Sequence, residues 1–444
     1  MPKSAKISLL AVSVALVITV FLGVDSSGVS AASQEDGGAY QQIKVYTEVL
    51  HHIQQDYVTD PNINAVTDGA LRGLLASLDA DSSYLTAADY STYKATYKED
   101  KGARAQVGIN ISKRYEGFAT VISVVPGSPA DKAGLVDGDI LEGIEGKDTQ
   151  NISLAMMRLM LEGAPGSTLT VGLVGHNNKP EPEQIQMTRV AVTVPPVVDT
   201  LPQAMGQAYA NTGILYLKPE ILDREHVQQV EAKLKEMQKR GDKKVLLDLR
   251  DVAAGDMEQA TRMANFLLKD GTIATLEGQK FPKQVFMADH DKTINWTAPV
   301  VVLVNRGTAG PAEVVAAALG DNKRGEVVGE KTFGEGAQQK TFELPDGSAL
   351  ILSVAKYESP SGKKLQDVGV TPEVVLGQPS EEMAEGDADP VQAQDAAKPS
   401  SPGVRAKPSI PGAVAPLPVA PAKKTVQPDE QLAKALDILK AKAA

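Results

Sequence analysis

The stretch that decides the fold reads Pro299-Val300-Val301-Val302-Leu303-Val304-Asn305-Arg306-Gly307-Thr308-Ala309-Gly310-Pro311-Ala312-Glu313. Its first part, residues 299–304, is a continuous apolar run with the length of one buried strand. A turn that contains two glycines follows, and residues 313–319 continue as an apolar helix. A strand that leads through a tight turn into a helix is typical of α/β folds with a parallel sheet. The stretch therefore predicts an α/β core.

Segments on both sides of this unit extend the same pattern. Residues 212–217 and 245–250 read as strands, and residues 226–240 read as an amphipathic helix. We therefore expect a multidomain α/β protein whose core covers residues 195–378.

A second informative stretch reads Gly329-Glu330-Lys331-Thr332-Phe333-Gly334-Glu335-Gly336-Ala337-Gln338-Gln339. Together the two stretches resemble the active-site region of the carboxyl-terminal processing peptidases, also called tail-specific proteases. In that family a serine is the nucleophile and a lysine is the general base. The resemblance places the nucleophile position at Gly310 and the base position at Glu335, 25 residues apart. It also matches Gln339 to the glutamine that orients the base in the family.

Neither of the two matched positions carries the group that the chemistry needs. A serine–lysine pair works because a neutral amine removes the hydroxyl proton while the oxygen attacks a carbonyl. Gly310 offers no nucleophile, and Glu335 has no adjacent hydroxyl to activate. In the family a glycine-rich turn supplies amides to the oxyanion hole; here residues 252–254 of that turn are Val, Ala and Ala, and only Gly255 is retained. We therefore expect a catalytically inactive member of the family.

Two other hypotheses stay open at this point. The first is an active serine-type endopeptidase with a displaced dyad, for which Thr308 is the nearest hydroxyl and Lys331 the nearest amine. Geometry would have to bring these two groups together before their pKa values matter. The second is an adaptor or scaffold of the cell envelope, whose partners would be folded proteins rather than peptides.

Residues 104–190 resemble a PDZ domain of the kind found in bacterial proteases. The resemblance rests on the segments Pro126-Gly127-Ser128-Pro129-Ala130 and Gly138-Asp139-Ile140-Leu141. PDZ domains bind extended peptides by adding a strand to a sheet edge. The resemblance implies that the amides of residues 106–108 capture a terminal carboxylate beside a helix over residues 153–162. The peptide-binding candidates are Val107, Gly108, Ile109, Met157 and Leu161.

The N-terminal residues predict export. Lys3 and Lys6 precede an uncharged apolar run over residues 7–24, and small residues lead up to Ala32. This pattern predicts a signal peptide over residues 1–31, with an uncleaved membrane anchor as the alternative. Both interpretations place the rest of the chain across the membrane, in the periplasm or on its extracytoplasmic face. Membrane contact is expected only through an uncleaved N-terminal segment.

Two further segments flank the PDZ domain and the core. Residues 38–100 carry apolar residues at helical spacing and resemble the N-terminal helical domain of the same family. Residues 379–428 are rich in Pro and Ala and predict a disordered linker. Residues 429–443 predict a C-terminal helix with Leu432, Leu436 and Leu439 on one face.

Composition narrows the range of partners. A net charge of −11 without a long basic run argues against a nucleic-acid partner. The chain has no cysteine, and none of its five histidines forms a ligand-spaced pair, so we expect neither a metal nor a cofactor. The expected partners are peptides or protein C-termini, with other envelope proteins and a second copy of the chain as further candidates.

Overall fold

The structure is a computed structural model, and it describes residues 37–98, 105–113, 117–174, 183–209, 212–240, 242–294, 297–377 and 429–442. The expected signal peptide over residues 1–31 and the expected linker over residues 379–428 lie outside these ranges. The chain divides into two units, Met1–Ala70 and Leu71–Ala444.

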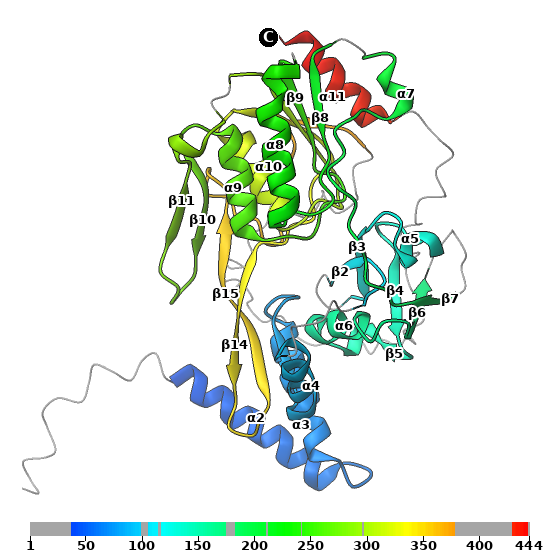
Figure 1. Cartoon of the computed structure of the whole chain (residues 1–444). Coiled ribbons are helices and arrows are strands. Elements are labelled where there is room, and N and C mark those ends of the chain that lie inside the picture. The colour runs from blue at the N-terminus through cyan, green and yellow to red at the C-terminus, as the bar shows by residue number, and fades with distance from the viewer. Residues whose placement is uncertain are drawn as a thin grey trace, which may run out of the picture. The chain divides into compact units, whose positions relative to one another are not determined.

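The centre of the larger unit is a parallel sheet with the strand order β16-β13-β12-β9-β8. Figure 1 labels two of its strands, β8 and β9. Its strands are β8 (Ile214–Leu217), β9 (Lys244–Asp248), β12 (Val300–Val304), β13 (Gly325–Gly329) and β16 (Val374–Val375). All residues of β9 and β12 are buried, as expected for a parallel sheet covered on both faces. Because β12 is the middle strand, its carboxyl end opens at the centre of the sheet edge.

Successive residues of these strands face different helical layers because side chains alternate across a sheet. Val245 and Val300 belong to the apolar cluster formed with α8, α9 and α10. Their neighbours Leu246 and Val301 belong to the cluster formed with α11. The four helices are α8 (Arg224–Arg240), α9 (Met257–Leu267), α10 (Pro311–Asp321) and α11 (Glu430–Ala441). The C-terminal helix therefore completes the second face of the core.

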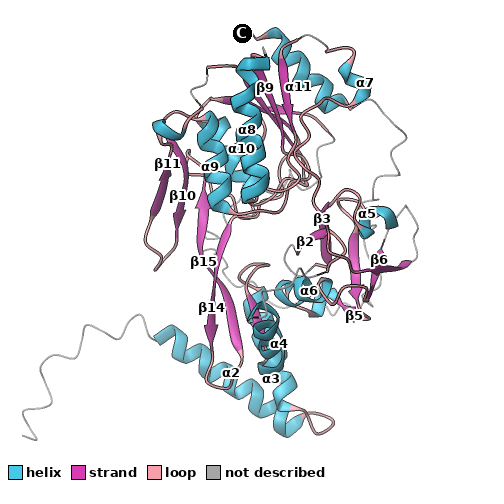
Figure 2. Cartoon of the chain, in the orientation of Figure 1, coloured by secondary structure: helices cyan, strands magenta, loops and turns pink. Residues whose placement is uncertain are grey.

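An antiparallel sheet lies beside this core, with the order β1-β15-β10-β11 and with β14 paired to β15. Figure 2 shows β14 and β15 as a long hairpin. Its strands are β1 (Ser83–Leu85), β10 (Thr272–Glu277), β11 (Gln284–Met287), β14 (Ala337–Glu343) and β15 (Ala349–Glu358). Strand β14 begins two residues after Glu335, so the hairpin holds one end of the segment that carries the base position.

A third sheet, with the order β2-β3-β4-β6-β7 and with β5 paired to β4, is antiparallel. Its strands are β2 (Ile109–Lys113), β3 (Ala119–Val124), β4 (Ile140–Ile144), β5 (Lys147–Asp148), β6 (Thr168–Val174) and β7 (Glu183–Thr188). The helical elements are α5 (Pro129–Ala133), the short η1 (Thr149–Asn151) and α6 (Leu154–Leu161). Strand β2 stands at the end of the order, so one of its edges is not paired within the sheet.

Arg189 holds α6 in place. Its guanidinium is buried and donates to the carbonyl oxygens of Met160 at 2.7 Å and of Leu161 at 3.2 Å. A cation at the carboxyl end of a helix satisfies carbonyl groups that lack helical partners and complements the helix dipole. Ser153 caps the other end, where its hydroxyl accepts from the amide of Met156. Both ends of the helix beside β2 are therefore fixed.

The smaller unit contains α2 (Gly37–Asp56), on which several apolar side chains, among them Ile43 and Val49, are exposed. The next helices along the chain are α3 (Ile63–Ala76) and α4 (Ala87–Lys98), and Tyr90 of α4 packs with Leu85 and Ile351. Two short elements, α7 (Gln203–Gly206) and η3 (His290–Lys292), complete the set. Among the described helices, none combines the length and the apolar character that crossing a membrane requires.

The mixed α/β architecture predicted from the sequence is confirmed, and the element boundaries differ by a few residues. The strand expected from residue 212 starts at Ile214, because Gly213 has a φ of 65° that no strand accommodates. The helix expected from residue 226 starts at Arg224, where the Asp223 carboxylate accepts from the amide of His226 at 2.8 Å. The helix expected over residues 429–443 spans Glu430–Ala441.

Candidate functional site

Gly310 occupies the sharp turn between β12 and α10, with φ 57° and ψ −117°. This positive φ lies outside the regions that L-residues prefer, and glycine adopts it without steric cost. Strained strand-to-helix turns of this kind present the nucleophile of α/β-hydrolases. A Cβ atom at position 310 would meet only the carbonyl oxygen of Glu335, at 3.9 Å. The turn therefore keeps both the backbone shape and the space of a nucleophile position, but it carries no reactive group.

The buried carboxylate of Glu313 joins the two matched stretches. It accepts hydrogen bonds from the amides of Gly310 at 2.9 Å, of Gly334 at 2.8 Å and of Glu335 at 2.8 Å. The hydroxyl of Thr332 is a fourth donor. Burial raises the pKa of Glu313 to about 7, although the four donors favour the charged form and oppose this rise. Glu313 therefore sets the distance between positions 310 and 335.

A second, partly buried connection links the first stretch to the turn after β9. The side chain of Asn305 donates to the carboxylate of Asp251 at 2.7 Å, and its oxygen accepts from the Asp251 amide at 3.0 Å. The amide of Ala309 donates to the carbonyl of Val252 at 3.0 Å, and Val252 is fully buried. The turn after β9 is thus tied to the turn that carries Gly310.

Pro311 is a functionally relevant position that sequence reasoning missed. In nucleophile turns of α/β-hydrolases, the residue after the nucleophile donates its backbone N–H to the oxyanion hole. Proline has no N–H, so position 311 offers no such donor. The signal was available in the sequence, since Pro311 directly follows Gly310, but proline at the first helical position also has a common structural role.

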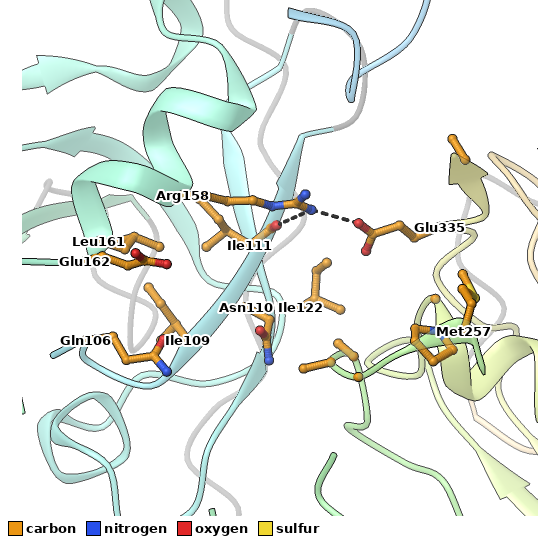
Figure 3. A pocket seen from close by; sticks show the side chains of 16 residues that line it. Gln106, Ile109, Asn110, Ile111, Ile122, Arg158, Leu161, Glu162, Met257 and Glu335 are labelled. Carbon is orange, nitrogen blue, oxygen red and sulfur yellow. Dashed lines mark hydrogen bonds and ion pairs between the residues drawn. The ribbon is translucent and has the colours of Figure 1, made fainter. Parts of the chain in front are cut away.

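Glu335, at the matched base position, forms an ion pair with Arg158. Its carboxylate accepts from the guanidinium of Arg158, on α6, at 2.7 Å (Figure 3). Arg158 also donates to the carbonyl oxygen of Ile111, on β2, at 3.4 Å. On its other side Arg158 lies 3.9 Å from the carboxylate of Asp81. Burial and the nearby Glu335 carboxylate raise the pKa of Asp81 to about 7, although Arg158 opposes the rise.

Ile111, Arg158 and Glu335 line a cavity of about 370 Å³. One wall comes from β2, α6 and their neighbours, and the other comes from the turns of the core. The lining residues used below are Ile109, Ile111, Arg158, Leu161, Gly310 and Glu335. Position 310, position 335 and the edge of β2 therefore open into one space. Within the described ranges, no group of three or more His, Asp or Glu side chains could hold a metal ion.

The side chains offered for a displaced dyad are not arranged for catalysis. Thr308 is fully buried, and its hydroxyl donates to the carbonyl of Leu249 at 2.8 Å while accepting from the amide of Asn305 at 3.0 Å. Lys331 is partly buried and is not among the residues that line the cavity. The Thr308 hydroxyl is therefore part of the turn, without access to a substrate carbonyl.

Gln339 is also placed differently from its predicted role. Its side chain donates to the carbonyl of Ala337 at 3.2 Å and lines a second cavity together with Asp81 and Arg158. The pairing of β14 with β15 shifts register between Gln338 and Gln339, and the extra residue, Val354, is on β15. The structure thus gives Gln339 no hydrogen bond to Glu335.

The five peptide-binding candidates fall into two groups. Ile109 and Leu161 line the cavity. Val107 and Met157 are fully buried in the apolar core between the sheet and α6, so their side chains support the groove from behind. Gly108 has a φ of 83°, and a Cβ atom there would lie 2.3 Å from that of Ser128. Of the two candidates on α6, Met157 therefore belongs to the core and Leu161 lines the cavity.

Comparisons with known proteins match both the core and the PDZ domain. The profile of peptidase family S41 matches residues 213–376, and that of the PDZ domain matches residues 96–174. A chloroplast C-terminal processing peptidase of Tetradesmus obliquus is 31% identical over 70% of this chain and 68% of its own length. A carboxyl-terminal-processing protease of Synechocystis is 30% identical over 75% of this chain and 76% of its own.

A solved structure supports the same assignment. The photosystem II D1 C-terminal processing protease matches with a TM-score of 0.60 and 28% identity, over 74% of this chain and 86% of that one. The chain belongs to the carboxyl-terminal processing peptidase family, with a PDZ domain and an S41 peptidase core.

Proposed function

We propose that this protein binds peptides or protein C-termini in the cell envelope and does not cleave them. The observation that carries the proposal is the state of position 310, where the turn has the shape of a nucleophile turn and holds no nucleophile. Pro311 and the altered turn at residues 252–254 support it, because electrostatic stabilisation of the oxyanion is a large part of such catalysis. Glu335 supports it further, since its carboxylate is engaged by Arg158.

Peptide binding is supported by the geometry of the PDZ domain. Strand β2 is at the end of its sheet, and its residues 109–111 line the cavity opposite α6. An extended peptide can add to such an edge through main-chain hydrogen bonds, while apolar side chains such as Ile109 and Leu161 select its side chains. The proposed ligand is therefore an extended segment, such as the free C-terminus of an unfolded protein.

Two measurements on the full chain test this proposal. A peptide library varied at its last residues should show selective binding, and an unfolded protein with an apolar C-terminus should stay uncleaved. A flat response across the library would refute peptide recognition. Cleavage that is lost on Thr308→Ala would instead support the displaced dyad, which the buried Thr308 hydroxyl disfavours.

We further propose that the protein is exported, on the basis of the basic and apolar pattern in residues 1–31. Fractionation of cells that express the chain with and without these residues tests the proposal. The chain that lacks them should remain in the cytoplasm. Equal distribution of the two chains would contradict export by this segment.

A further inference from the structure

Arg158 crosses the space in which a peptide would have to lie. It starts from α6, and its guanidinium reaches the Ile111 carbonyl of β2 at 3.4 Å and the Glu335 carboxylate at 2.7 Å (Figure 3). An added strand pairs with the main-chain groups of the edge strand, and the Ile111 carbonyl is one of these groups. A peptide that pairs with β2 at this point must therefore displace Arg158.

Arg158 is also the one basic side chain among the residues that line the cavity. Its side chain is 40% exposed, whereas that of Glu335 is 23% exposed, so the guanidinium can be reached from the cavity. A guanidinium binds carboxylates in a planar, two-pronged geometry. The carboxylate that it holds in the structure belongs to the chain itself, at the position where the family has a lysine.

We propose that Arg158 is the group that selects carboxylate-bearing peptides, and that Glu335 is an internal carboxylate that occupies Arg158 until such a ligand replaces it. This inference rests on the proposed peptide-binding function and adds the chemistry of the ligand. The carboxylate comes either from the terminus of the peptide or from an acidic side chain near it. The substitution of the family lysine thus converts the base position into a competitor for the ligand.

Asp81 helps a ligand carboxylate to replace Glu335 at Arg158. Its carboxylate lies 3.9 Å from Nη1 of Arg158, whereas Nη2 of Arg158 contacts Glu335. When a ligand displaces Glu335, Arg158 keeps this second carboxylate nearby, so its charge is not left unpaired. Asp79, Asp367, Glu162 and Tyr93 also lie around this pair. These four groups are acidic and favour retention of the guanidinium at this place, and Lys356 pairs with Asp367 at 3.5 Å.

The test measures binding of a fluorescent peptide to the full chain by anisotropy. The peptide is used with a free carboxylate, with an amidated terminus, and with an added glutamate near an amidated terminus. Glu335→Gln removes the internal carboxylate and nearly keeps the side-chain volume. Arg158→Gln removes the guanidinium. Glu277→Gln, in the exposed Glu277–Lys283 ion pair of β10 and the following loop, is the matched control.

Glu335→Gln should strengthen binding of the carboxylate-bearing peptide by about three- to tenfold, the net contribution of one typical hydrogen bond. Glu335→Gln should change binding of the amidated peptide without a glutamate only a little. The control Glu277→Gln should change the binding of neither peptide. In the Arg158→Gln background, Glu335→Gln should have no further effect. The comparison of the free-acid and glutamate peptides identifies whether Arg158 binds the terminal carboxylate or the side-chain carboxylate.

Two results would overturn the inference. The first leaves the proposed peptide-binding function intact, and the second refutes that function as well. If peptides bind selectively but Glu335→Gln leaves the preference for carboxylates unchanged, the competitor role is wrong and the proposed function stands. If neither the wild type nor Glu335→Gln binds any peptide, both are wrong. Arg158→Lys, which keeps the charge but loses the planar fork, should bind with intermediate affinity if the protein remains folded.

Discussion

The amides of Gly310 and Glu335 donate to the same atom, Oε2 of Glu313, at 2.9 and 2.8 Å. The two positions that the sequence resemblance matches to the family's catalytic pair are thus held together by a buried carboxylate in this chain. The frame of the site does not depend on the reactive side chains, because it is built from backbone amides. This explains how both reactive groups can be absent while their positions remain in register.

Restoring the two reactive groups should not restore efficient cleavage. Gly310→Ser with Glu335→Lys returns the dyad, but Pro311 still lacks the amide that an oxyanion hole needs. Loss of one oxyanion donor costs about 100- to 1,000-fold in kcat. Adding Pro311→Ala to the double variant should therefore raise cleavage of an unfolded protein, measured by gel densitometry.

The control for this series is Gly310→Ala with Glu335→Lys and Pro311→Ala, which has no nucleophile and should be inactive. Cleavage by the double variant at the same rate as by the triple variant would show that Pro311 is irrelevant. The turn at residues 252–254 would then also be adequate as it stands.

Removal of the Thr308 hydroxyl should affect stability rather than catalysis. The hydroxyl is fully buried and bonds to Leu249 and Asn305, so Thr308→Ala should lower the free energy of unfolding by about 1–3 kcal/mol. Thr308→Ser keeps the hydroxyl and should lose less. Chemical denaturation of both variants measures which of them loses more unfolding free energy. Equal losses of unfolding free energy would show that the hydrogen bonds contribute little.

The stability of the protein should depend on pH through Glu313. Its pKa is about 7 in the fold, against 4.5 for an ordinary glutamate, so the folded state holds this proton more tightly than the unfolded state. The resulting stabilisation is complete below about pH 4.5 and is lost as the pH rises through about 7. Urea denaturation between these limits should show the unfolding free energy of the wild type falling as the pH rises.

Glu313→Gln isolates this contribution, because its side chain cannot titrate. The variant should be less stable overall, since its amide group meets donors on all sides, but it should show a smaller fall of stability over the same pH range. An identical pH dependence in both proteins would assign the effect to other groups, of which Asp81 is the first to examine.

The C-terminal helix α11 should stabilise the core through a few apolar contacts. Leu436 is fully buried against the parallel sheet, so Leu436→Ala should lower the unfolding free energy by about 2–5 kcal/mol. Lys434, exposed on the same helix, gives the matched control, and Lys434→Ala should change stability little. Similar effects of both substitutions would show that the helix does not stay docked in solution.

The sequence alone determined the class of fold and predicted the loss of the catalytic groups. Both follow from local patterns. Consecutive residues predict the strand, the turn and the helix around Gly310, and the sequence itself shows that position 310 has no hydroxyl. The core residues Val245 and Val300 were equally predictable, because burial on both faces of a parallel sheet requires an uninterrupted apolar run.

Only the tertiary structure decided what Glu335 contacts. Its partner Arg158 lies on a helix of another domain, 177 residues away in sequence, and no pattern in either segment links them. The same holds for Glu313, whose donors come from two stretches, and for Met157, whose place behind the groove depends on how α6 packs. Such contacts arise from the packing of distant elements, so a pattern read along the chain predicts the groups but not the partners that they meet.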